Sequence, residues 1–278
     1  NFVFSQELKL LPFREIDDEA FHLILRKVHN SLTWRNFWAV LTLLNDYAYG
    51  WLFWFPLVIL TYPLYFLSTH YDIHMPLIVL PRQISLIFTF LTAYILYKIL
   101  SLFTKNKTIK STILLLFLMY PTFAYFSLRF GTVAQTMFFG SLALYLALKA
   151  EIITYKSLFL IALSLAAAVG TKLSGLLMAP LIGFIIGTQL EWKINTVNLK
   201  LALFFGLCFI LMALLFSNPQ LLVAFYKPEI AKKFLNIILF QMEKTHTNYG
   251  PPIAFLSKYT RGIASSVGPT ILFWLFLS

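Results

Sequence analysis

The chain has 278 residues, of which 59% are hydrophobic and only 12% are charged. A soluble domain carries about 25% charged residues, so this composition excludes an ordinary soluble fold and indicates a membrane protein. The net charge of +11 does not indicate nucleic-acid binding, because the Lys and Arg residues of a membrane protein collect in cytoplasmic loops and near anionic lipid. Cys208 is the single cysteine, so the chain forms no internal disulfide.

Residues 1–50 are mixed in polarity and are predicted to form a first external loop that contains an interfacial helix. Asp17 or Asp18 can cap this helix, which is too polar to span a bilayer. Its apolar face consists of Phe21, Ile24, Leu25 and Val28, whereas His22, Arg26 and His29 fall on another face.

Apolar stretches then follow one another, several of them close to the roughly 20 residues that cross a bilayer. They are Trp51–Leu67, Ile84–Phe103, Ser111–Leu128, Val133–Leu148, a pair within 157–190 that is broken at Gly170-Thr171-Lys172, Leu201–Phe216 and Thr270–Ser278. The chain starts with Asn1 rather than Met and ends inside an apolar stretch. We therefore expect a fragment of a longer protein that lacks the first transmembrane helix and a C-terminal part.

Short links rich in lysine separate these stretches and predict the topology, because such links face the cytoplasm. The cytoplasmic links are 105–110, 149–156 and 193–200. Alternation then puts residues 70–83, Arg129–Thr132, the surroundings of Lys172 and a second large loop, 217–268, outside. Residues 1–50 are external only if Trp51–Leu67 lies in the interface or re-enters it, which Pro56 and Pro63 permit.

Six short motifs occur in order along nearly the whole chain. They are Ile16–His22 with its acidic cluster, Asp46–Phe53, Pro81–Ser85, Pro121–Arg129, Gly170–Gly175 and Asn218-Pro219. In this order and spacing they resemble the motifs of the GT-C superfamily of integral-membrane glycosyltransferases. The branch that they resemble contains the protein O-mannosyltransferases and aminoarabinose transferases, often grouped as glycosyltransferase family 39.

This resemblance implies an all-α fold, in which residues 1–278 form one polytopic transmembrane helix bundle of GT-C type with interfacial helices in its external loops. It also implies transfer of a hexosyl or pentosyl group from a polyprenyl-phosphate-linked donor to a hydroxyl of an acceptor protein, lipid or glycan. The anomeric carbon would be inverted, and the reaction would take place at the external membrane face. We expect a multi-pass protein embedded in membrane lipid, and a prokaryotic plasma membrane is favoured over the endoplasmic reticulum.

The base for such a reaction is a carboxylate held outside the bilayer. In the family's external motif an aspartate directly precedes a glutamate, so the resemblance implies that Asp18 is the base, with Asp17 and Glu19 beside it. The residues themselves leave a second interpretation open, in which Asp17 and Asp18 only cap the interfacial helix.

Cations are needed to offset the charge of the departing phosphate. The candidates are Lys172, Arg82 and Arg129, together with His246 in the second external loop, where family members contact the donor phosphate or the acceptor. Lys172 interrupts an apolar pair, so it either binds the phosphate or snorkels to the interface. Arg82 is equally consistent with a simple interfacial anchor.

Tyr47 and Tyr49 are candidates for contact with the sugar or the polyprenyl chain, and His22 is grouped with them as a substrate-binding candidate. Tyrosine is also enriched at every membrane interface, so an aromatic belt remains the alternative. Many family members carry a second acidic residue after the Pro121–Arg129 motif, but residues 129–133 contain none. A divalent metal is therefore not favoured, and no cofactor is expected.

Two other functional classes remain open. A transporter or lipid flippase would need polar groups deep inside its spans or broken helices in paired positions. This chain keeps its charges at the ends of apolar stretches, apart from Lys172, which favours the enzyme. A non-catalytic subunit of a larger assembly is the third class.

Overall fold

The computed structural model describes residues 25, 28, 29, 50–71, 75–120 and 131–217 of the chain. These residues form seven α-helices and one 3-10 helix, and none of them forms a strand, which confirms the all-α class for this part of the chain. The helices are α4 (Trp51–Tyr71), α5 (Met75–Phe103), α6 (Lys107–Met119), α8 (Val133–Lys149), α9 (Tyr155–Thr171), η1 (Leu173–Met178), α10 (Ala179–Gln189) and α11 (Thr196–Ser217).

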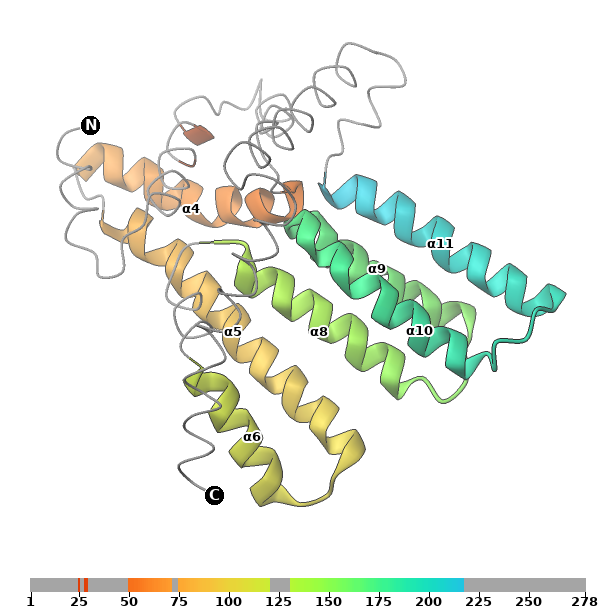
Figure 1. The fold of residues 1–278 in the computed structure, drawn as a ribbon. Coiled ribbons are helices and arrows are strands. Elements are labelled where there is room, and N and C mark those ends of the chain that lie inside the picture. Colours follow the sequence, from red (N-terminus) through yellow and green to blue (C-terminus); the bar gives the residue numbers. More distant parts are fainter. Residues whose placement is uncertain (1–24, 26–27, 30–49, 72–74, 121–130, 218–278) are drawn as a thin grey trace, which may run out of the picture.

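Four long helices, α5, α8, α9 and α11, lie side by side, and α4 lies across one end of them (Figure 1). We call this the glycine end, because Gly50 and Gly170 meet there near Ser217. The opposite end holds the links α5–α6, α8–α9 and α10–α11 (Figure 1). We call it the lysine end, because the three lysine-rich links of the sequence lie there.

Three helices begin at least four residues earlier than the sequence pattern predicts. Helix α6 begins at Lys107 rather than Ser111. Helix α5 begins at Met75 rather than near Ile84, so residues 75–83 belong to the helix. The run Met75–Leu80 is itself apolar and continues the helix, and Pro81 in its second turn removes only one backbone donor. Helix α11 begins at Thr196 rather than Leu201, because the side chain of Asn195 accepts a hydrogen bond from the backbone N–H of Asn198 at 2.7 Å.

Two of the described helices are long and apolar enough to cross a membrane, namely Val79–Phe103 and Thr196–Ser217. Four more apolar segments are shorter: Trp51–Leu67, Val133–Lys149, Tyr155–Thr171 and Ser174–Gln189. A helix of 17 residues is about 26 Å long, close to the roughly 30 Å of a hydrocarbon core. Large apolar side chains are exposed along α5 and α11 and on α4, as expected of surfaces that face lipid rather than water.

The buried core has two parts. One lies among α8, α9, α10 and α11 and is built around small residues of α8, such as Ala143 and Ala147, that let large side chains of α9 approach closely. The other packs Phe53, Trp54 and Leu57 of α4 against Leu25 and Val28. The apolar face predicted for the first helix is confirmed at these two residues, both of which are helical and buried.

His29 departs from the predicted pattern. The sequence puts it on a face away from Leu25 and Val28, but its side chain is only 3% exposed. Thr61 of α4 has one hydroxyl hydrogen and donates it to the carbonyl of Leu57 at 2.6 Å. Nε2 of His29, 2.7 Å from that hydroxyl, is therefore the donor. The imidazole is therefore buried against Thr61 of α4, a contact that the helical period of the sequence does not reveal.

Candidate functional site

The break between α9 and η1 falls at Lys172, as the sequence predicts. Lys172 is extended, with φ −154° and ψ 134°, and ends α9. Its carbonyl accepts a hydrogen bond from the N–H of Gly175 at 2.8 Å. A Cβ atom at Gly175 would lie 2.5 Å from the carbonyl carbon of Ala168, so only glycine lets η1 fold back onto α9 here. The close packing of η1 on α9 therefore explains the glycine at position 175 of the Gly170–Gly175 motif. Lys172 lies half-buried at the turn between these two helices.

Gly50 and Gly170 bring three helices into backbone contact at the glycine end. The N–H of Gly50 donates to the carbonyl of Thr171 at 3.2 Å, and a Cβ atom at Gly50 would lie 1.9 Å from the carbonyl oxygen of Gly170. A Cβ atom at Gly170 would lie 2.3 Å from Cβ of Phe216. The start of α4, the end of α9 and the end of α11 therefore meet next to Lys172.

The start of α8 joins the same site through threonine side chains. The hydroxyl oxygens of Thr136 and Thr171 lie 2.8 Å apart. Thr136 also donates to the carbonyl of Thr132 at 2.9 Å, and Thr132 and Thr171 are buried. Gln135, in the first turn of α8, is buried as well. A polar cluster thus lies between α8 and α9, directly before Lys172 in the chain.

The electrostatics of this site favour an anion. The amino-terminal ends of α4 and α8 carry partial positive charge from their unpaired backbone N–H groups, and Lys172 adds a full charge beside them. In the described ranges the acidic residues are Glu151 and Glu191, and both lie at the lysine end. Phosphate oxygens are the ligands that such helix ends and a lysine bind best.

The other cation candidate within the described ranges is Arg82. It is half-buried and lies two turns inside α5, rather than opening that helix as the sequence suggests. It belongs to a different helix from Lys172, and α5 packs against α8. The remaining predicted site residues lie outside the described residues: Asp17, Asp18, Glu19, His22, Tyr47, Tyr49, Arg129 and His246.

Sequence reasoning missed the threonine cluster. A usable signal was present, because Thr132 and Thr136 are spaced by four residues and so share one face of a helix. It also missed the pairing of His29 with Thr61, for which the sequence carries no local signal. Among the described residues, no group of three His, Cys, Asp or Glu side chains is arranged to hold a metal ion.

Comparisons with protein-family models, with curated proteins and with solved structures find no match to this chain.

Proposed function

We propose that this chain is an integral-membrane glycosyltransferase that moves a sugar from a polyprenyl-phosphate donor to an acceptor hydroxyl at the glycine end. One observation carries the proposal. Lys172 is a half-buried cation at a joint where the starts of α4 and α8 converge, with the carboxylates of the described residues at the opposite end. This arrangement suits a phosphate group held at the surface of an apolar bundle.

The reaction explains why a cation matters at this position. The acceptor oxygen forms a bond to the anomeric carbon, and the bond from that carbon to the phosphate oxygen breaks. The phosphate leaves with the electron pair and gains one negative charge. Lys172 and the two helix ends therefore interact more strongly with the transition state than with the bound donor, which is the condition for rate acceleration.

The proton of the acceptor hydroxyl passes to a carboxylate, and we assign this role to Asp18, as the resemblance of the Ile16–His22 motif implies. The carboxylates of the described ranges, Glu151 and Glu191, lie at the lysine end. The base must therefore come from another segment. Asp18 precedes the helical residues Leu25, Val28 and His29, which pack on α4, and the start of α4 reaches the Lys172 joint through Gly50.

Charge distribution supports an orientation for the bundle in a membrane. The described cations number nine lysines and one arginine, and all except Arg82 and Lys172 lie in or next to the three links of the lysine end. By the positive-inside rule the lysine end faces the cytoplasm, so the glycine end faces outward. We propose that the protein is a multi-pass protein of a prokaryotic plasma membrane, and this orientation lets the acceptor reach the site from outside.

The test is a transfer assay with a radiolabelled polyprenyl-phosphate sugar and the full-length protein in nanodiscs. Lys172→Gln should lower kcat by about 10²-fold, the usual effect of removing one group that stabilises developing charge, and Lys172→Arg should retain part of the rate. Lys156→Gln is the matched control, because Lys156 is exposed at the lysine end and should leave turnover unchanged.

Asp18→Asn separates catalysis from helix capping in the same assay. Asparagine caps a helix as well as aspartate does, but it cannot accept a proton at neutral pH. Loss of a general base costs about 10²–10⁴-fold in rate, and Asp17→Asn is the internal comparison. Normal turnover by both Asp variants and by Lys172→Gln would remove the catalytic roles assigned to Asp18 and Lys172, whereas absence of transfer by the unaltered protein would remove the enzymatic assignment. Transbilayer movement of the donor by a chain without transferase activity would favour the flippase.

A further inference from the structure

A groove of about 330 Å³ opens between α10 and α11 at the lysine end. Ile186 of α10 and Leu190, which follows that helix, line one side of it, and Ala202 and Phe205 of α11 line the other. It lies far from Lys172, since the α10–α11 link is at the opposite end of the bundle (Figure 1). The proposed glycosyl transfer therefore does not account for it.

The link between the two helices is shaped to leave this groove open. Glu191 and Trp192 both adopt the left-handed region, with φ of 53° and 51°, which residues other than glycine adopt rarely. The N–H of Trp192 donates to the carbonyl of Gly187 at 3.0 Å. The indole then lies over Gly187, where a Cβ atom would be 2.5 Å from the ring. The tryptophan is thereby fixed as an apolar wall at the mouth of the groove.

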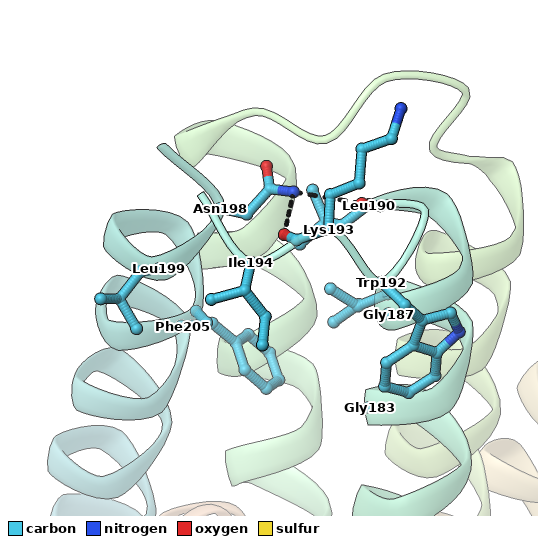
Figure 2. A pocket seen from close by; sticks show the side chains of 11 residues that line it. Gly183, Gly187, Leu190, Trp192, Lys193, Ile194, Asn198, Leu199 and Phe205 are labelled. Atoms are coloured by element: carbon cyan, nitrogen blue, oxygen red, sulfur yellow. Dashed lines mark hydrogen bonds between the residues drawn. The ribbon is translucent and has the colours of Figure 1, made fainter. Parts of the chain in front are cut away.

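Asn198 fastens the other side of the link. Its side-chain amide donates to the carbonyl of Leu190 at 3.1 Å and to the carbonyl of Lys193 at 2.8 Å, as the dashed lines in Figure 2 show. The carbonyls of Leu190 and Lys193 thus have hydrogen-bond partners at the rim, and the interior is left to apolar side chains. Figure 2 also shows the Lys193 side chain rising away from the apolar walls.

The groove combines an apolar interior with a cationic rim. Trp192 is 62% exposed and Ile194 is 98% exposed, which is costly in water and ordinary in an acyl-chain environment. Lys193 lines the groove and is exposed. Glu191 pairs with Lys193, but a pair exposed on both sides is weak and exchanges readily for another anion.

We propose that this groove binds an acyl chain of an anionic phospholipid from the leaflet on the lysine side, with the headgroup phosphate at Lys193. The charge of the rim selects an anionic headgroup, and the volume holds part of one chain rather than a whole lipid. The proposal depends on the chain crossing a membrane and not on its catalysing sugar transfer. Each lysine near a membrane surface should favour the anionic lipid by about fivefold.

The test uses photo-crosslinking of the full-length protein in phosphatidylcholine nanodiscs. Either phosphatidylglycerol or phosphatidylcholine carries a diazirine in one acyl chain, and adducts are mapped by peptide mass spectrometry. We expect adducts within 183–205 to form at least about fivefold more efficiently from phosphatidylglycerol. Lys193→Gln should abolish that preference, and Lys193 is exposed, so folding is unaffected.

Gly183→Leu tests the groove itself. Gly183 lines the groove, and a Cβ atom there would meet no heavy atom within 4 Å, so leucine enters the groove without a clash. Gly206→Leu is the matched control, because Gly206 has equal space and lies outside the lining. Loss of the adducts in Gly183→Leu alone would support the proposal.

Two results would overturn it: equal adduct yields from the two lipids in the unaltered protein, or unchanged adducts in Gly183→Leu. Transfer activity measured in the same nanodiscs is a separate readout. Absence of that activity would count against the proposed function while leaving the lipid result intact.

Discussion

Gly170→Ala is the most direct test of the joint at the glycine end. The added Cβ atom would lie 2.3 Å from Cβ of Phe216 and 3.0 Å from its carbonyl carbon. The backbone of α11 fixes the positions of both atoms, so rotation of the Phe216 side chain does not relieve the contact. Helix α9, helix α11 or both must shift, and overpacking of this kind typically costs about 1–3 kcal/mol.

The intrinsic helix preference acts in the opposite direction. Gly170 lies inside α9, and alanine is favoured over glycine within a helix by up to about 1 kcal/mol. Gly206→Ala in α11 provides the control, because a Cβ atom there meets nothing within 4 Å. The same substitution should therefore stabilise the protein at residue 206 and destabilise it at residue 170. The propensity gain is common to both variants, so they should differ by the overpacking cost of about 1–3 kcal/mol.

Apparent Tm values of the two variants in one detergent give the measurement. For a chain of this size each kcal/mol corresponds to about 2–4 °C, so Gly170→Ala should melt several degrees below Gly206→Ala. Gly170→Ala should also lower transfer activity, because the shift moves Lys172. Adding Phe216→Gly should recover part of the stability, since it removes the Cβ atom at 2.3 Å. A Gly170→Ala protein as stable as the Gly206→Ala protein would mean that α9 and α11 do not approach in this way.

Three further predictions concern pH, metal and topology. Burial lowers the pKa of His29 from 6.5 to about 4, so only the unfolded chain takes up its proton between these values. The free energy of unfolding should therefore be highest above pH 6.5 and fall by about 3 kcal/mol toward pH 4. The fall of Tm with decreasing pH should be smaller in His29→Gln than in the unaltered protein. An equal fall of Tm in both proteins would contradict the burial of a neutral His29. Transfer should continue in EDTA, because residues 129–133 contain no carboxylate, and activity that returned only with added Mn²⁺ or Mg²⁺ would contradict this. Cysteines introduced at positions 18 and 107 in a Cys208-free protein should be labelled from opposite faces of the membrane, and labelling from one face would end the GT-C interpretation.

Local sequence patterns were sufficient to predict most of the helices and the concentration of lysines in the links between them. Apolar runs and lysine-rich links are short-range features, so they predicted helices α8 and α9 to within a few residues. Helices α5, α6 and α11 begin earlier than these features predict. The break at Gly170-Thr171-Lys172 was also visible, because a lysine between glycines and threonine interrupts an apolar run. The same patterns indicated that Lys172 lies opposite the lysine-rich links, and the helix order agrees (Figure 1).

The tertiary structure decided which of these features meet. The sequence marks Gly50, Gly170 and Gly175 as possible turns, but only the packing shows that each permits a backbone contact that a Cβ atom would block. The burial of His29 depends on Thr61 in another helix, and the groove beside Trp192 depends on two left-handed residues in the link. Helical period and charge report on a residue's own segment. Contacts between distant segments depend on how whole helices fit together, and that fit is what forms the joint around Lys172.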